Sequence, residues 1–221
     1  MNVYVVVEGE RAAKKIYKTW IPIVNPTLQY IDYLNQLGQN NFFILAGFGQ
    51  SQFLNNQIEH AIKDVNNLPF DRLVLAIDSE DKSFQDKLTE LTDRVDRIVC
   101  NVQVKYVIQH FCFETWLLGN RQIIRRKTND HDLKRFREIF DIRQNDPELL
   151  PANNERTWNR SQFALQYLRA GLRDVHPANR VSYTKRNPGV VVTEGYFNQV
   201  KKRYIEENHI MSFKGFLDAF I

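Results

Sequence analysis

The sequence has only two cysteines, Cys100 and Cys112, among its 221 residues. Two isolated cysteines form neither a zinc-ribbon pattern nor the framework of a disulfide-stabilised secreted domain. No apolar run approaches the roughly 18 residues that suggest a membrane-spanning helix. The first residues lead directly into an apolar segment, without the basic start and small-residue cleavage site of a secretory signal. We therefore expect a cytoplasmic protein that does not associate with a membrane.

Common nucleotide-binding and metal-binding motifs are also missing. The segment 47–49, Gly-Phe-Gly, lacks the third glycine of a dinucleotide-binding loop and the lysine of a Walker loop. The five histidines have no metal-binding spacing, and the chain contains no internal repeat or low-complexity tract. With 43% hydrophobic and 25% charged residues, the composition is that of a packed globular protein. Any control by ATP would have to come from another protein.

Short apolar segments alternate with amphipathic segments in the first half of the chain. This alternation favours an α/β fold, with a mostly parallel sheet flanked by helices. Ser83 and Asp86 fit a capping box at the start of one helix, and Pro22 and Pro26 are expected to end another. The expected strands are 3–7, 41–46, 73–77 and a strand or strand pair over 97–107, and the expected helices are 11–20, 53–65 and 83–95.

The second half differs in charge and in pattern. Residues 1–110 hold 11 basic and 13 acidic residues, a net charge of −2, whereas residues 111–221 hold 19 and 13, a net charge of +6. We therefore predict an α/β core over 1–110 and a basic, mainly helical part over 111–221 that packs on it. In the second half, helices are expected at 113–143, 158–173, 195–206 and 212–220, with a loop over 145–157.

Acidic residues follow two of the expected strands. Glu8 comes after the first strand and precedes Gly9, and Asp78, Glu80 and Asp81 follow the strand at 73–77. Parallel sheets place their chemistry at the carboxyl ends of strands, so these carboxylates converge if the two strands are neighbours. Clustered carboxylates repel unless a cation neutralises them, and Mg²⁺ prefers such oxygen ligands. The alternative interpretation is that they are ordinary acids at helix N-termini, favoured by the helix dipole.

Both segments together resemble the motifs of the Toprim domain. The matching pieces are residues 5–9, Val-Val-Val-Glu-Gly, and residues 73–81, which end in Asp78-Ser79-Glu80-Asp81. The resemblance implies a Toprim-like core over 1–110 and a Mg²⁺ ion, with Mn²⁺ as a substitute, for breaking or joining phosphodiester bonds. Its implied ligands are Glu8, Asp78 and Glu80. Glu80 stands where the family has Asp, and Asp81 could substitute, so the second motif ligand stays open.

A further segment narrows the resemblance. Residues 110–118, with Glu114 and Trp116, look like the Phe-Glu-x-Trp-Leu segment of small stand-alone Toprim proteins, and residues 212–217 are similar to their ends. These proteins include the RloB type and relatives of the OLD-nuclease Toprim domain, found in restriction and phage-defence loci. The resemblance implies that Glu114 is an added metal ligand, for a second ion, and that Lys185 lies near the metal. The alternatives are a helix-capping Glu114 and a solvated Lys185.

The resemblance implies a Mg²⁺-dependent nuclease that cleaves nucleic acid as an effector in phage defence. An alternative from the same resemblance is a non-catalytic or restrained Toprim subunit that binds an ATPase partner encoded nearby. The sequence leaves open whether the target is DNA or RNA. We expect the basic half to contact the phosphate backbone by charge rather than to read bases. The residues expected to do so are Arg125, Arg126, Lys127, Arg135, Lys201, Lys202 and Arg203.

Overall fold

The computed structural model of the chain describes residues 1–9, 11–47, 49–176, 183–184 and 186–221. It contains one sheet of five strands, and every pair of neighbouring strands is parallel. Their order in the sheet is β2-β3-β1-β4-β5. The strands are β1 (Val3–Val7), β2 (Gln29–Ile31), β3 (Asn41–Ala46), β4 (Arg72–Asp78) and β5 (Gln103–Gln109).

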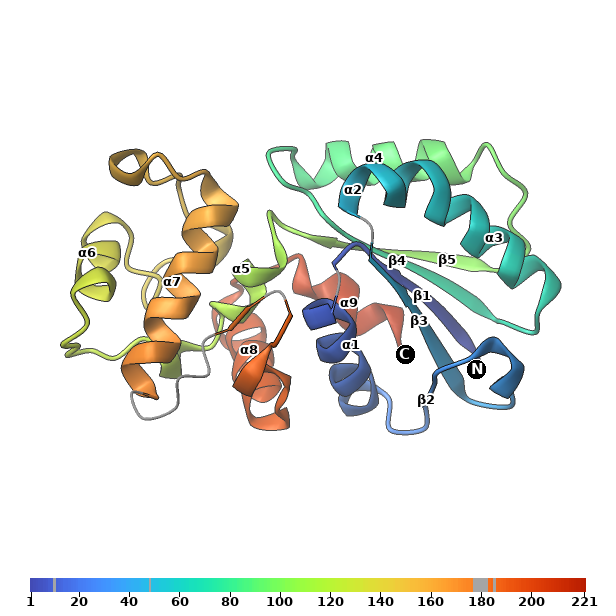
Figure 1. Cartoon of the computed structure of the whole chain (residues 1–221), viewed down its shortest axis with the longest axis horizontal. Helices are drawn as coiled ribbons and strands as arrows, with labels where there is room; N and C mark the ends of the chain where they lie inside the picture. Colours follow the sequence, from blue (N-terminus) through green and yellow to red (C-terminus); the bar gives the residue numbers. More distant parts are fainter. Residues whose placement is uncertain (10, 48, 177–182, 185) are drawn as a thin grey trace.

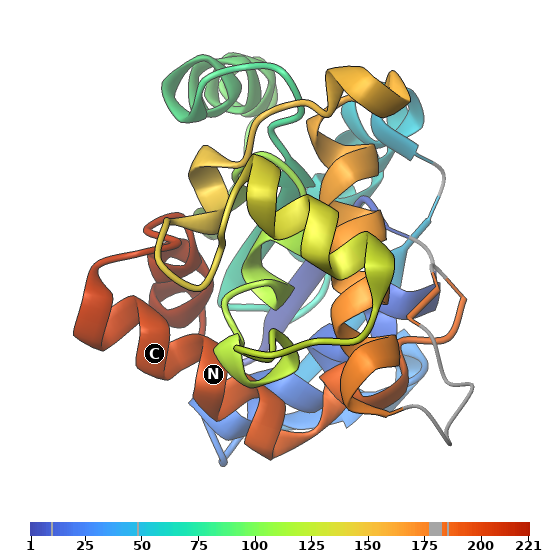
Figure 2. The same cartoon turned by 90° about the vertical axis from the view of Figure 1, so that its left-hand side faces the viewer.

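Helices cover both faces of this sheet. In Figure 1, α2, α3 and α4 lie on one side of the strands, and α1 and α9 lie on the other. The helices α6 and α7 lie beyond α5, away from the sheet, and Figure 2 shows them in front of the strands when the molecule is viewed from that end. The helices are α1 (Arg11–Val24), α2 (Gly49–Gln52), α3 (Ile58–Asn67), α4 (Phe84–Val95), α5 (Phe113–Leu117), α6 (His131–Ile139), α7 (Arg160–Val175), α8 (Glu194–Glu207) and α9 (Phe213–Ala219).

Strand β1 explains why both faces must be covered. All five of its residues are buried apolar side chains, and successive side chains point to opposite faces. Val3, Val5 and Val7 pack into a core with α1, α8 and α9, whereas Tyr4 and Val6 pack into a second core with α3 and α4. The predicted fold class, an α/β protein with a parallel sheet flanked by helices, is confirmed.

The last helix of the basic half packs on the sheet of the first half. Helix α9 lies against β5, and its Phe216 contacts Tyr17 of α1 edge-on at 5.2 Å between ring centroids. Trp20 of α1 packs in the same way against Phe197 of α8 at 5.3 Å. The two halves therefore share a continuous aromatic core. None of the helices in the described part of the chain is long and apolar enough to cross a membrane.

The start of the chain differs from the prediction in two elements. Helix α1 runs through Pro22 to Val24 instead of stopping at residue 20, because Trp20 and Ile21 are completely buried and hold its last turn against the core. Strand β2 was not expected. It is a three-residue edge strand that pairs with β3, too short to show an alternating pattern.

The fourth expected strand begins later than predicted. Residues 97–102 are not part of β5, because Asn66 at the end of α3 fixes the preceding segment as a loop. Its side-chain amide donates to the carbonyl of Val99 at 2.7 Å, and its side-chain oxygen accepts from the backbone N–H of Asn101 at 2.8 Å. β5 therefore starts only at Gln103.

The region 113–143, expected to be helical, is helical only in separate short pieces. Helix α5 ends at Leu117, and Gly119 follows where a Cβ atom would lie 2.8 Å from the carbonyl oxygen of Trp116. The side chain of Asn120 caps a short 3₁₀ turn, and Asp130 caps a new helix, α6, by accepting from the N–H of Leu133 at 3.0 Å. Side-chain caps of this kind start separate helices in a basic stretch that otherwise has helix-forming composition.

A buried polar cluster fixes α5 to the beginning of α9. The indole N–H of Trp116 donates to the Ser212 hydroxyl at 2.7 Å, and this hydroxyl donates to the carboxylate of Glu148. The backbone N–H of Ser212 also donates to Glu148, at 3.1 Å. Burial raises the pKa of Glu148 from its ordinary value of 4.5 to about 7, although the bonds from Ser212 oppose the shift. The cluster thus contains an acid that titrates near neutrality.

The raised pKa predicts that Glu148 makes the protein less stable as the pH rises. The folded state binds the proton of Glu148 more tightly than the unfolded state. The stabilising contribution of this group is therefore fully present below about pH 4.5 and is lost as the pH rises through about 7. The loss amounts to up to about 3 kcal/mol. Glu148→Gln should remove this part of the pH dependence, measured as the free energy of unfolding in urea at about pH 5 and about pH 8.

Glu138→Gln, at an exposed position on α6, is the control and should keep the wild-type pH dependence. Equal pH dependence in the wild type and in Glu148→Gln would contradict the assignment of this titration to Glu148.

Candidate functional site at the carboxyl edge of the sheet

The structure places Glu8 and Asp78 at the ends of neighbouring strands. β1 pairs with β4, with Val7 opposite Ala76, so both strands end at the same edge of the sheet. The backbone N–H of Glu8 donates to the carbonyl of Ala76 at 3.0 Å. Its carboxylate oxygen Oε2 accepts from the backbone N–H of Asp78 at 3.2 Å. The Glu8 side chain therefore lies across the end of β4, beside Asp78.

Gly9 brings the end of β1 close to helix α1. A Cβ atom at Gly9 would lie 2.7 Å from the Cβ atom of Ala13, a distance that side chains do not tolerate. Larger residues at either position would push the helix away from the sheet edge. The small residues Ala12 and Ala13 line the cavity that Asp78 also lines.

The segment after β4 separates the candidate acidic ligands. Backbone N–H groups of Ser79 and Glu80 donate to the carbonyls of Gln109 and Phe111, at 3.0 and 2.8 Å, which ties the segment to the end of β5. Glu80 has a φ of 52°, in the left-handed region, and its side chain is exposed. Asp81 is exposed as well, whereas Asp78 is half-buried. Neither Glu80 nor Asp81 lines the cavity that Asp78 lines.

Glu114 joins Asp78 at one small cavity. Its side chain is only 7% exposed, and it lies in the first turn of α5. Asp78 and Glu114 line a cavity of about 70 Å³, together with Gly9, both alanines of α1, Phe113 and Tyr183. Trp116 and Leu117 of the same helix are completely buried. The structure thus brings together a carboxylate from β4 and one from α5, 36 residues apart in the sequence.

Tyr183 is a residue of this site that the sequence analysis did not select. Its hydroxyl donates to Oε1 of Glu114 at 3.2 Å, and the residue is 3% exposed. Burial raises the pKa of Tyr183 well above its ordinary value, and the negative charges of Glu114 and Asp78 raise it further. Tyr183 therefore stays protonated and donates to Glu114. Lys185, which the sequence analysis selected two positions later, lies outside the described residues.

These carboxylates have the chemistry of magnesium ligands but do not form a closed cage. Among the described residues, no group of three or more His, Cys, Asp or Glu side chains is arranged to hold a metal ion. One oxygen of Glu8 is directed to the backbone N–H of Asp78. Mg²⁺ is commonly held by one or two carboxylates, with waters and substrate phosphates as the other ligands. Asp78 and Glu114, which share one cavity, fit that sparse type of site.

Three of the expected nucleic-acid contacts lie together on one exposed segment. Arg125, Arg126 and Lys127 are exposed, and Arg125 lies 3.9 Å from a carboxylate oxygen of Asp174. Arg137 supports the segment from behind, because its guanidinium donates to the carbonyls of Arg125 and Arg126 at 2.9 and 2.8 Å. The backbone of this basic segment is therefore fixed while its side chains face solvent.

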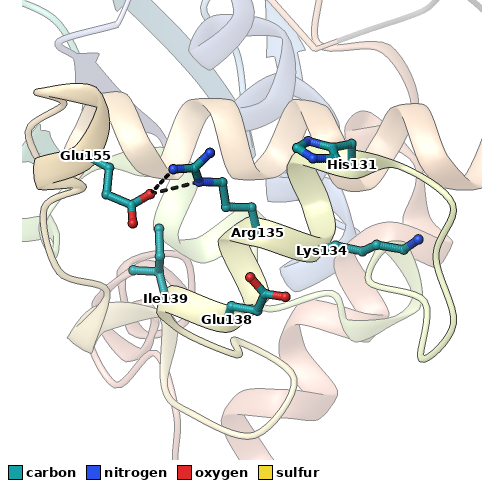
Figure 3. A pocket seen from close by; sticks show the side chains of 6 residues that line it. All are labelled: His131, Lys134, Arg135, Glu138, Ile139 and Glu155. Atoms are coloured by element: carbon teal, nitrogen blue, oxygen red, sulfur yellow. Dashed lines mark hydrogen bonds and ion pairs between the residues drawn. The ribbon is translucent and has the colours of Figure 1, made fainter.

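Arg135 is committed to a carboxylate on another segment. It lies on α6 at the edge of an open cavity of about 520 Å³, where Figure 3 shows it turned towards Glu155. Its Nε and Nη2 atoms both lie 2.8 Å from the same oxygen of Glu155. A contact with a phosphate would have to compete with this pair.

The three basic residues expected on α8 are not equivalent. Lys202 is exposed and lies 3.9 Å from Glu206, one turn further along the helix, and Lys201 is half-buried. Arg203 is only 3% exposed, so it is not a surface cation and cannot guide nucleic acid along the protein surface. The helical period explains the difference, since residues 200 and 203 share the face of α8 that packs into the core.

Comparison of the chain with protein-family models, with curated proteins and with solved structures finds no match. The Toprim resemblance therefore rests on the motif residues themselves.

The Tyr183 hydrogen bond predicts a specific loss of stability. Tyr183→Phe leaves the buried carboxylate of Glu114 without this donor, so the free energy of unfolding should fall by about 1–3 kcal/mol. Glu114→Gln keeps an acceptor oxygen and removes a buried charge, so it should cost less than Tyr183→Phe. Denaturant unfolding of both variants measures the two changes.

Tyr204→Phe is the matched control, because Tyr204 is half-buried and its hydroxyl forms no hydrogen bond among the described residues. It should be as stable as the wild type. Wild-type stability of Tyr183→Phe would show that the bond to Glu114 does not contribute.

Proposed function

We propose that this protein is a Toprim-like, Mg²⁺-dependent nuclease that cleaves phosphodiester bonds at the carboxyl edge of its sheet. One observation supports this most directly. Asp78 and Glu114, from two different motif segments of the resemblance, line the same cavity, and Glu8 lies against the backbone of Asp78. The same resemblance suggests a role as an effector in phage defence.

The chain's own residues have separate tasks in this proposal. Asp78 and Glu114 would supply the carboxylate oxygens for the metal, and Glu8 would orient the end of β4 and add negative charge. Tyr183 would fix one oxygen of Glu114 and leave the other for the ion. When bound, Mg²⁺ supplies stabilisation of charge on the phosphate oxygens and on the attacking or leaving oxygen.

Glu80 and Asp81 would have a more peripheral role. Both are exposed and lie outside the cavity of Asp78, so they would act at its rim through waters or on the incoming phosphate. The segment Arg125–Lys127 would attract nucleic acid by charge, because its side chains are exposed and its backbone is fixed by Arg137.

Conservative changes at the strand ends test the proposal. Glu8→Gln and Asp78→Asn should each lower Mg²⁺-dependent cleavage of nucleic acid by more than about 100-fold, since each removes charge from the metal site. Both variants should be as stable as the wild type or more stable in metal-free buffer, because neighbouring carboxylates repel. Cleavage is measured on single-stranded and double-stranded DNA and RNA with Mg²⁺, with Mn²⁺ and with EDTA.

Glu59→Gln and Asp93→Asn make the same chemical changes at exposed positions on α3 and α4, and they should cleave at the wild-type rate. Glu114→Gln should slow cleavage and raise the Mg²⁺ concentration that half-maximal activity requires. Wild-type cleavage by folded Glu8→Gln and Asp78→Asn would remove this site from the reaction.

The basic segment yields a separate expectation for binding. Replacing Arg125, Arg126 and Lys127 together by glutamine should weaken binding to unrelated sequences about equally, because phosphate contacts carry no sequence information. The slope of log affinity against log salt should become shallower by up to about 3, one for each lost phosphate contact. Fluorescence anisotropy at several salt concentrations measures both effects.

A triple variant of Lys15, Lys63 and Arg97 removes the same charge from exposed positions elsewhere and should keep most of the affinity and the slope. A loss confined to one sequence would indicate base reading, and an unchanged salt slope would exclude the segment from the contact.

A further inference from the structure

Another cavity, outside the proposed cleavage site, lies between helix α8 and the turn that follows α5. It has a volume of about 240 Å³. Three cations line it, Arg121, Lys202 and Arg203, together with Gln199 and the carboxylates of Glu206 and Glu207. The lining therefore has one more positive than negative charge.

The two carboxylates already have cationic partners at the rim. Glu207 pairs with the guanidinium of Arg121 at 2.7 Å, and Glu206 lies 3.9 Å from the ammonium of Lys202. All four side chains are partly exposed. Arg203 lies deeper in the protein, and it is the third lining cation, which has no carboxylate within ion-pair distance among the described residues.

Arg203 has neutral hydrogen-bond partners although it is only 3% exposed. Its Nη2 atom donates to the carbonyl of Asn145 at 2.6 Å, and its Nε atom donates to Nδ1 of His209 at 3.2 Å. Among the residues that the structure describes, Nη1 has no hydrogen-bond acceptor and the guanidinium forms no ion pair with a carboxylate. A buried charge without a charged partner is costly, so this arrangement favours a ligand of opposite charge.

Other charges around Arg203 compensate it only in part. Burial and the nearby guanidiniums of Arg121 and Arg143 lower the pKa of Arg203 to about 10, and the carboxylates of Asp146 and Glu207 oppose this shift. Both carboxylates have other partners, because Glu207 pairs with Arg121 and Oδ1 of Asp146 accepts from the backbone N–H groups of Glu148 and Ile210, both at 3.0 Å. The Nε atom of Arg121, which lines the same cavity, also lacks an acceptor within the described residues. Two arginines that line this cavity thus each have a donor atom without an acceptor among the described residues.

We propose that this cavity is a binding site for a phosphate group, held by Arg203, Arg121 and Lys202. A tetrahedral phosphate offers several acceptor oxygens, and arginine forks match it in geometry and in charge. A free nucleotide and the phosphate of a nucleic-acid strand have this chemistry in common. The site does not depend on the proposed metal centre, since none of its residues lines the cavity of Asp78.

Isothermal titration calorimetry in EDTA-containing buffer of constant ionic strength tests the proposal without metal or cleavage. The probes are inorganic phosphate, a nucleoside 5′-monophosphate, and one oligonucleotide with and without a 5′-phosphate. The wild type should bind inorganic phosphate. Tighter binding of the monophosphate identifies a free nucleotide as the ligand. If only the 5′-phosphorylated oligonucleotide competes with inorganic phosphate, the ligand is the phosphate at a strand end. If both oligonucleotides compete with it, the ligand is the phosphate backbone.

Three single changes on α8 should affect phosphate affinity in different directions. Lys202→Gln removes a lining cation and should weaken binding about tenfold, the effect of one charged hydrogen bond. Glu206→Gln removes a lining carboxylate and should tighten binding, an increase that simple damage to the fold would not produce. Lys201→Gln changes the same charge at the neighbouring position, which does not line the cavity, and should leave affinity nearly unchanged.

Arg203→Lys keeps the buried charge and loses the guanidinium fork, so it should weaken binding more than Lys202→Gln if the variant folds. If Arg203→Lys does not fold, the variants at the exposed positions 202 and 206 still test the proposal. Absence of binding by the wild type to all four probes would overturn the proposal. Equal affinity in Lys202→Gln, Glu206→Gln and the wild type would overturn it too, because the bound phosphate would then lie elsewhere.

Discussion

The hydrogen bond from the Trp116 indole to the Ser212 hydroxyl is the contact on which the arrangement of the candidate site depends. It joins α5, a helix of five residues, to the start of the last helix. A helix so short has little stability of its own, so tertiary contacts must fix its position. Phe213 adds an edge-on contact with Trp116 at 5.2 Å, and the Tyr196 hydroxyl donates to the carbonyl of Leu117 at 2.8 Å. With α5 fixed, Glu114 lines the same cavity as Asp78.

Burial changes what a charged side chain does in this protein. Glu148 lies in the interior between α5 and α9, where its pKa rises to about 7 and its protonation couples stability to pH. Arg203 lies in the interior of the basic half, where it cannot form part of an open nucleic-acid surface, and we propose that it holds a phosphate group there. Exposed charges such as Arg126 and Lys127 remain available for weak, salt-dependent contacts. Net charge along the chain does not distinguish these roles.

The sheet was largely predictable because its central strands are buried on both faces. β1, β3 and β4 are continuous apolar runs, which mark such strands without help from tertiary contacts. The elements that the prediction missed depend on contacts between distant residues. β2 exists through its pairing with β3, and the late start of β5 depends on Asn66 of α3. Pro22 remains helical because Trp20 and Ile21 are buried beside it.

The sequence alone determined which carboxylates stand at strand ends, because Glu8 and Asp78 directly follow buried strands and parallel strands end at one edge. Glu114 was selected only through the resemblance of residues 110–118 to a segment of stand-alone Toprim proteins. Only the tertiary structure decided that Glu114 shares a cavity with Asp78, that Tyr183 donates to it, and that Glu80 and Asp81 lie outside that cavity. The physical reason is that side-chain burial and hydrogen bonding depend on packing between segments. Tyr183 lies 69 residues after Glu114, a separation over which no local pattern specifies a contact.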